Sequence, residues 1–352
     1  MAYTTINDPS IHFNTVLYTG NGKDDRAVIG TGFQPDWLWY KERSSTSEHR
    51  AFDSSRGASK RLEPNNTNTE ATDTTNHKSF DSDGFTVGTS GSTNAVGDTY
   101  VAWQWKANGG TTTTNDASAT GVGTIDSVFQ ANTTAGFSIV THTGTGSAGT
   151  IAHGLGAVPK WMLIKRRTGT TENWCNYHAS NTSAPATDVF FLNSADATAD
   201  TDSVWNDTDP TSTVFSVKDG GAVNESGGTY VTYLFTPIQG YSKFGGYTGN
   251  GNADGTFVYT GFKPAWLMIK RINSSNNWHI HDNKRDTFNV ANAPLLANTS
   301  DAELTNTTVD FLSNGFKLRT SVNFANGSEA YVYFAFAESP FVTSNKVPNN
   351  AR

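Results

Sequence analysis

One stretch of this 352-residue chain occurs three times. A proline, a tryptophan two positions later and a lysine four positions after that recur in residues 35–41, 159–165 and 264–270. An extended aromatic segment follows each copy, at residues 100–105, 230–235 and 331–336. A repeat of this length is the strongest constraint on the fold, because each copy must form the same small unit. The repeats therefore predict one module that is used three times.

The composition favours β-structure. Only 16% of the residues are charged, against about 25% in ordinary domains, and Thr, Ser, Asn and Gly supply the remaining polarity. Short strands bounded by turn residues recur, whereas the apolar spacing of a helix is not sustained over three turns. Asp83-Gly84 and Asn314-Gly315 stand between apolar runs and predict β-hairpins. We predict an all-β chain of three tandem antiparallel β-sandwich modules.

The repeats also place the module boundaries. We expect modules at residues 1–108, 137–239 and 240–352. Residues 109–136 are rich in Thr and Gly and show no core pattern, so they are predicted to be a polar linker that neighbouring modules or chains hold in place. The second and third modules are joined almost directly through residues 236–240 and are expected to pack as a fixed pair.

The charge balance excludes several classes of partner. A net charge of −7 argues against nucleic acid and against insertion into or binding to an anionic membrane. No apolar run approaches the length of about 20 residues that a membrane helix needs, and the first residues do not resemble a signal peptide. We expect a protein that is made in the cytosol and leaves it, if at all, by another route such as cell lysis. With Cys175 as its single cysteine, the chain cannot form an intrachain disulfide or a cysteine-rich zinc site.

Positions shared by all copies are predicted to build the module. Side chains alternate between the two faces of a strand, so Val101, Trp103 and Trp105 share one face in the first copy. The later copies carry the same Val-aromatic-aromatic stripe. We predict that the large repeated aromatics are core residues, namely Trp37, Trp161, Trp266, Trp103, Tyr233 and Phe334.

Aromatics without a counterpart in every copy are the better candidates for a site. Trp205 lies in a loop and has no partner in the other copies, and the Asn-Trp pairs at Trp174 and Trp278 have none in the first. We predict that these three tryptophans contact a ligand or a partner chain.

The sequence offers weak metal signals. His279 and His281 could share a strand face with Asp282 beside them, but a metal site would need a further ligand. Acidic loops could suggest calcium, which needs six to eight convergent oxygens that spacing alone does not show; they contain Asp81, Asp83, Asp98, Asp196, Asp200 and Asp202. Aspartates of this kind mostly cap turns, so we expect no metal and no cofactor.

Together, several longer motifs are specific. They occupy residues 16–22, 34–37, 100–107, 135–140, 153–156, 240–245 and 311–317. Through them the chain resembles a family of virion proteins that is abundant in marine bacteriophages, including cyanophages. The resemblance implies concanavalin-like or jelly-roll sandwich modules in tail fibres or other exposed parts of the virion, and it implies no enzymatic activity. The first module starts close to Met1, so we expect no long N-terminal adaptor, and tail fibre, tail tip and head surface all stay open.

The expected function follows from these points. The sequence has no glycosidase-like pair of carboxylates on a strand, no nucleophile elbow and no phosphate-binding loop. We expect a non-enzymatic structural protein of a phage particle that is used in host attachment. Its expected partners are other virion proteins, copies of itself in a trimer and, as a candidate ligand, host surface polysaccharide. The alternatives are a head-surface decoration protein and a glycan-binding or glycan-cleaving module.

Overall fold

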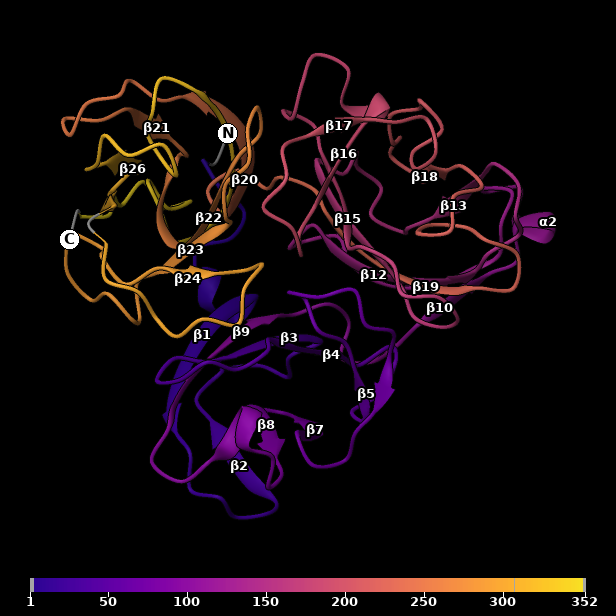
Figure 1. The fold of residues 1–352 in the computed structure, drawn as a ribbon, viewed down its shortest axis with the longest axis horizontal. Coiled ribbons are helices and arrows are strands. Elements are labelled where there is room, and N and C mark those ends of the chain that lie inside the picture. Colours follow the sequence, from indigo (N-terminus) through magenta and orange to yellow (C-terminus); the bar gives the residue numbers. More distant parts are fainter. Residues whose placement is uncertain (1–2, 307, 351–352) are drawn as a thin grey trace.

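The structure is a computed structural model that describes residues 3–306 and 308–350. Its strands gather in three lobes around a common centre (Figure 1). Each lobe holds a large antiparallel sheet and a smaller one, so the predicted all-β sandwich fold is confirmed. The described helical segments are short and lie in connections: η1 (Pro9–Ile11), α1 (Gly91–Asn94), α2 (Ala117–Thr120) and η2 (Pro185–Thr187).

The first and third lobes have similar topologies. In the first lobe the large sheet has the order β1-β9-β3-β4; these strands are Phe13–Thr19, Thr99–Trp105, Trp37–Glu42 and Arg50–Asp53. Its small sheets are β2-β8-β7 (Arg26–Ile29, Gly84–Val87, His77–Asp81) and β5-β6 (Lys60–Arg61, Ala71–Thr72). In the third lobe the large sheet is β20-β27-β22-β23-β24 (Ser242–Thr248, Ala330–Pro340, Phe262–Arg271, His279–Asp282, Leu295–Leu296). The smaller sheet there is β21-β26-β25 (Phe257–Tyr259, Gly315–Leu318, Val309–Leu312).

The second lobe has a wider large sheet, in the order β10-β11-β12-β19-β14-β15-β16-β17. Its strands are Thr113–Asn115, Ser127–Asn132, Phe137–Thr143, Thr229–Phe235, Trp161–Arg166, Cys175–His178, Asp188–Phe191 and Ala199–Asp200. The smaller sheet pairs β13 (Gly149–Ala152) with β18 (Val214–Val217).

The two predicted hairpins form where Asp-Gly and Asn-Gly stand, between β7 and β8 and between β25 and β26. The glycines are required by close backbone packing. A Cβ on Gly84 would lie 2.0 Å from the carbonyl oxygen of Val28, and one on Gly315 would lie 2.0 Å from that of Val258. These positions therefore let a third strand approach each hairpin.

The two repeated segments pair as neighbouring strands in every lobe. Trp37 lies opposite Trp105 in the first lobe, Trp161 opposite Phe235 in the second, and Trp266 opposite Phe336 in the third. Both faces of these central strands are buried, as their continuous apolar character indicates. The face that carries Leu38 and Tyr40 in the first lobe packs against that lobe's own smaller sheet, with Phe85 and Val87.

The tryptophan face instead packs between the lobes. Trp37 stacks on Tyr233 of the second lobe with ring centroids 4.4 Å apart. Trp161 meets Phe334 of the third lobe at 4.8 Å, and Trp266 meets Trp103 of the first at 6.4 Å. All six predicted core aromatics are buried, but they form one cluster that all three lobes share. The repeated aromatic stripes therefore join the lobes, rather than filling the interior of a single sandwich.

Two of the three repeated lysines also bind across a contact between lobes. Lys165 donates its Nζ to the carbonyl oxygen of Thr67 in the first lobe at 2.8 Å. Lys270 donates likewise to Ala195 of the second lobe at 2.9 Å. Lys41 binds carbonyl groups of its own lobe, at Glu42 and Ser45. Burial lowers the pKa of each lysine to about 8, and the carbonyl oxygens satisfy the buried ammonium donors.

Two of the three contacts between lobes contain buried ion pairs. Between the first two lobes, Tyr233 donates to Asp53 at 2.7 Å, and Asp53 pairs with Arg56. Arg56 and Arg167 of the second lobe then share Glu70 at 3.0 and 2.8 Å.

The contact between the first and third lobes has the same construction. Trp103 donates its indole N–H to Asp282 at 2.9 Å, and Asp282 pairs with Arg285 at 2.6 Å. Arg285 and Arg43 of the first lobe share Glu303 at 3.1 and 2.8 Å.

The contact between the second and third lobes is built without a carboxylate opposite the repeated tryptophan. His178 stands where Asp53 and Asp282 stand in the other lobes, opposite the repeated tryptophan. Its Nε2 lies 3.2 Å from the carbonyl oxygen of Tyr333. Within residues 3–306 and 308–350, no ion pair joins these two lobes. The expected fixed pair of second and third lobes is thus part of a closed ring in which every lobe contacts the other two.

The prediction of a linker at residues 109–136 is wrong. This segment, which we call the extension, contributes β10 and β11 to the large sheet of the second lobe. Between them, the amide groups of Thr124 and Ile125 donate to the carbonyl of Thr150 in the smaller sheet at 2.8 and 3.0 Å. Backbone ladders hold the extension, and such ladders leave little hydrophobic periodicity in a sequence that is mostly Thr, Gly and Ala.

We expect Asp53→Ala to lower the free energy of unfolding by about 3–5 kcal/mol, because it removes the buried carboxylate that pairs with Arg56 and leaves Glu70 to balance both Arg56 and Arg167. The side chains of Asp53 and Arg56 have no exposed surface. The matched control is Asp254→Ala, which removes a carboxylate that is 78% exposed and should change the free energy of unfolding far less. Urea unfolding of both variants measures this, and equal losses would contradict a buried ionic contact between the lobes.

Hydrogen exchange should separate an ordered extension from a linker. We expect the amides of residues 127–132 to exchange as slowly as those of β12, because both strands belong to one ladder. The amide of exposed Thr112, which lies outside the strands, should exchange rapidly and serve as the internal reference. Equal, fast exchange over the whole of residues 109–136 would restore the linker interpretation.

Candidate functional site

The three tryptophans predicted to contact a ligand or partner chain are fully buried. Trp205 donates its indole N–H to the carbonyl of Asp188 at 3.1 Å and packs edge-on against Tyr177. Trp174 and Trp278 donate theirs across lobe contacts, to Glu63 at 2.9 Å and to Phe191 at 3.0 Å. The prediction is wrong because an indole N–H can be satisfied by a carbonyl of a neighbouring lobe, and absence from one copy of a repeat does not imply exposure.

In the first lobe, His49 takes the place of the tryptophan that the other two lobes carry at Trp174 and Trp278. Its Nε2 lies 3.1 Å from the carbonyl of Leu296 in the third lobe. The backbone N–H groups of His49, Trp174 and Trp278 each donate to a side-chain oxygen of an asparagine, at Asn65, Asn193 and Asn298. His49 is therefore structurally equivalent to Trp174 and Trp278, but its imidazole ring is smaller and more polar than an indole.

The weak metal signals do not converge in space. Among the described residues, no group of three or more His, Cys, Asp or Glu side chains could hold a metal ion. Asp282 is buried on the opposite strand face from His279 and His281, where it binds Arg285. Of the acidic loops, Asp81 accepts from Ser79 and Thr86 in its own turn, as a turn-capping carboxylate does.

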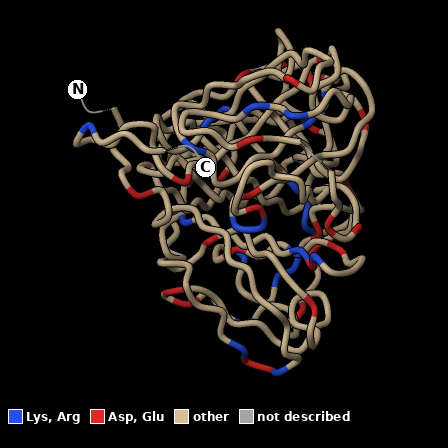
Figure 2. Tube along the Cα trace, turned by 90° about the vertical axis from the view of Figure 1, so that its left-hand side faces the viewer, with Lys and Arg blue, Asp and Glu red and all other residues tan. Residues whose placement is uncertain are grey.

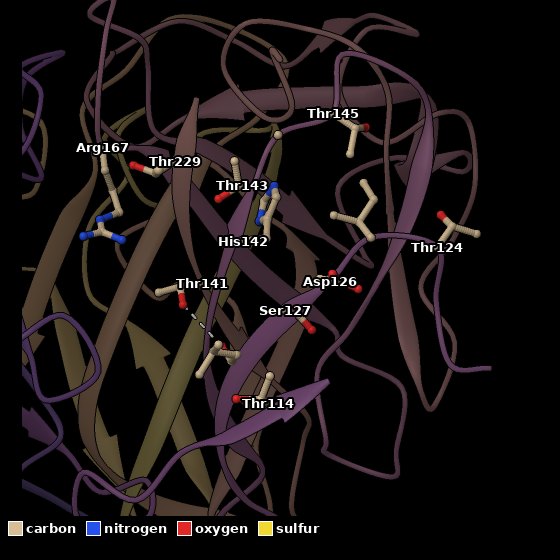
Figure 3. A pocket seen from close by; sticks show the side chains of 13 residues that line it. Thr114, Thr124, Asp126, Ser127, Thr141, His142, Thr143, Thr145, Arg167 and Thr229 are labelled. Carbon is tan, nitrogen blue, oxygen red and sulfur yellow. Dashed lines mark hydrogen bonds between the residues drawn. The ribbon is translucent and has the colours of Figure 1, made fainter. Parts of the chain in front are cut away.

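The extension creates surface that the other two lobes lack. An open groove of about 570 Å³ lies along β10, β11 and β12 (Figure 3). Hydroxyl-bearing residues are the most numerous in its lining, which also contains the apolar side chains of Ile125 and Val128. The polar members include one carboxylate, one imidazole and one guanidinium: Thr114, Thr124, Asp126, Ser127, Thr141, His142, Thr143, Thr145, Arg167 and Thr229. Because the extension has no counterpart elsewhere in the chain, this surface is not required by the repeat.

One pair of groove residues, Ser127 and His142, is held by contacts within the fold. Ser127 and His142 face each other across β11 and β12, an arrangement that could suggest nucleophilic catalysis. The Ser127 hydroxyl, however, donates to the carbonyl of Ala152 at 3.2 Å. The His142 Nε2 lies 3.1 Å from the carbonyl of Val223, and the ring stacks on Tyr230. These contacts give both side chains a structural role.

The charged groups of the groove are fixed by the fold. Arg167 makes two hydrogen bonds to Glu70, at 2.8 and 3.0 Å. Asp126 accepts from the amide of Ala117 at 2.8 Å. Thr143 and Thr229 lie opposite each other on β12 and β19 and also line the groove, and the Thr229 hydroxyl lies 3.0 Å from that of Thr168. The arrangement suits a polyhydroxylated ligand, which exchanges hydrogen bonds with hydroxyls and needs no reactive group.

A family model described as a domain of unknown function, DUF7483, matches residues 8–340. The chain belongs to the DUF7483 family. No curated protein matches the chain. The DUF7483 match runs from η1 to the end of β27, so one family unit spans all three lobes and the extension. None of the described helices of this DUF7483 protein is long and apolar enough to cross a membrane.

The histidines of the DUF7483 fold share one electrostatic property. Removal from water lowers the pKa of all eight, because burial disfavours the imidazolium. The pKa falls to about 4 for His142, His153 and His178 and to about 3 for His77 and His279, and it lies below its usual value for His12, His49 and His281. The folded protein therefore holds neutral rings at neutral pH.

We expect the free energy of unfolding to fall as the pH drops from 6.5 towards 4. Histidine in the unfolded chain takes up a proton near pH 6.5, whereas His142, His153 and His178 resist protonation until about pH 4 in the folded chain. Each such ring then costs about 1.4 kcal/mol per pH unit within this window. Thermal unfolding at pH 7, 6 and 5 measures the loss. A midpoint that stays constant over this range would show that the rings are not held neutral.

Proposed function

We propose that this protein is a non-enzymatic structural component of a bacteriophage virion, located in a tail fibre, a tail tip or another exposed surface, where it takes part in host attachment. The main structural observation that supports this proposal is the closed core, in which the aromatic faces of three lobes are buried against one another within a single chain. Such a core suits a particle component that must stay folded outside a cell. The virion assignment itself is supported by the motif resemblance described above.

The surface supports attachment more than catalysis. The groove of the second lobe presents hydroxyls and a single carboxylate, Asp126, whereas glycosidases use a pair of carboxylates across the scissile bond. Acidic and basic residues are interspersed along the chain (Figure 2), and the net charge is −7. These properties favour a neutral polar partner over nucleic acid. Host surface polysaccharide has this chemistry.

Copies of the chain are proposed to associate in the particle, with a trimer as the expected state. Any such association must use outer surfaces, because the strongest apolar faces are buried between the lobes of one chain. Symmetric association of whole rings would present several grooves to one host surface and raise the overall affinity by multivalency.

The test is to locate the chain in purified particles of the phage that encodes it and to measure binding to envelope polysaccharide of the host. We expect gold-labelled antibody on the outside of the particle, binding by the isolated protein, and no release of reducing ends. Thr141→Val and Thr143→Val together should weaken binding, because they remove two groove hydroxyls and keep the shape. Thr112→Val, on exposed chain outside the groove, is the matched control.

Absence of the chain from purified particles would overturn the virion assignment. Release of reducing ends from the polysaccharide would replace the attachment role by a glycan-cleaving one. Labelling over the head alone would favour a decoration protein over a fibre or tip.

A further inference from the structure

A second hollow lies on the other side of β10, at the mouth between the two sheets of the second lobe. It has a volume of about 350 Å³ and shares Thr114 with the groove. The extension forms one wall through Thr113 and Val122, and residues next to β13 and β18 form the other. Small-molecule sites have volumes of this order.

An aromatic ring forms part of this hollow. Phe129 on β11 is half-buried and packs against the apolar interior of the second lobe. Gly154 stands against the ring in a left-handed conformation, with φ of +71°, and a Cβ there would lie 2.3 Å from Phe129. Gly156, also left-handed, has nothing within 4 Å of its Cβ position. The two glycines thus keep space beside the ring that larger residues would fill.

Hydroxyl groups lie at the edge of a mainly apolar lining. Thr113 lies opposite Phe129 in the β10–β11 ladder, and Ser212 lines the other wall. Neither hydroxyl makes a hydrogen bond to another residue in the described part of the chain. No Asp, Glu, Lys, Arg or His is among the described residues that line it. The hollow therefore combines an apolar ring with neutral donors and acceptors that are free to bind a ligand.

We propose that this hollow binds one neutral sugar residue, with a C–H face of the pyranose against Phe129 and sugar hydroxyls bonded to Thr113 and Ser212. A purely apolar ligand would leave these hydroxyls without partners when it displaced water, which is costly. A uronic acid or a phosphate would enter a site without any cationic partner, and burial of an unpaired charge is more costly still. A neutral sugar is the class that matches both parts of the lining.

The inference rests on the proposed function, because it supplies a recognition element for the host polysaccharide. It is more specific than the groove, since it names a single neutral residue rather than a polar chain. The hollow and the groove lie on the two sides of the edge strand β10, so the two can be tested separately by substitution.

The experiment uses the full chain and a panel of neutral gluco-, manno- and galacto-oligosaccharides, with oligogalacturonate as the charged counterpart. Saturation-transfer NMR and calorimetric titration measure binding. We expect at least one neutral oligosaccharide to bind and oligogalacturonate not to bind. Phe129→Leu keeps apolar packing but removes the aromatic face, and it should weaken binding roughly tenfold. Thr113→Val should weaken it several-fold, whereas Thr112→Val should leave it unchanged.

The outcomes are decisive even if Phe129→Leu destabilises the fold, because Thr113 is on an exposed edge strand and its substitution spares the packing. Absence of binding by the whole neutral panel, or equal affinity of wild type and Thr113→Val, would overturn the inference. If the chain is found on particles and binds host polysaccharide with Thr113→Val unaffected, this inference fails and the proposed function stands. If neutral sugars bind in a Thr113-dependent manner but the chain is absent from particles, the reverse holds.

Discussion

The packing of three aromatic sheet faces against one another is the interaction on which this structure depends. Each large sheet is apolar on both faces, and its own smaller sheet covers only one of them. A lobe on its own would expose a row of tryptophan, tyrosine and phenylalanine side chains. Each such ring gains about 4–6 kcal/mol on leaving water, from an area of about 150–250 Å². The ring of lobes is therefore the unit that folds with a complete core.

Polar contacts determine how the lobes are arranged around that core. Aromatic packing is tolerant of rotation, whereas an indole N–H or a buried carboxylate must meet its partner at hydrogen-bond distance. In two of the contacts between lobes, a carboxylate binds both an arginine and the hydroxyl or indole N–H of an aromatic side chain; these carboxylates are Asp53 and Asp282. The third contact has the neutral His178 at the same position. The three contacts therefore differ in their polar groups. A wrong pairing of two lobes would leave a buried polar group without its partner, although the apolar faces are similar.

This arrangement leaves the differences between the surfaces of the lobes to segments outside the repeat. The shared core and its polar contacts use the repeated positions together with Trp174 and Trp278, which are equivalent to each other. The unrepeated Trp205 packs inside the second lobe. The extension is different, because it adds strands at the open edge of the second lobe and shapes the groove and the hollow on either side of β10. Addition at an edge alters the surface without disturbing the shared core, and it also covers unpaired edge groups.

The sequence by itself determined the strand class, the threefold repeat and the burial of its aromatics, since period-two patterning and repetition are local properties. It also located the two hairpins, because Asp-Gly and Asn-Gly pairs, which end at Gly84 and Gly315, are typical of tight β-turns. Tertiary structure alone decided what the aromatic stripes face, because alternation shows that a side is buried but not against which partner. It likewise decided that Trp205 is interior and that residues 109–136 are strands, since a carbonyl acceptor for an indole and a backbone ladder come from segments remote in sequence.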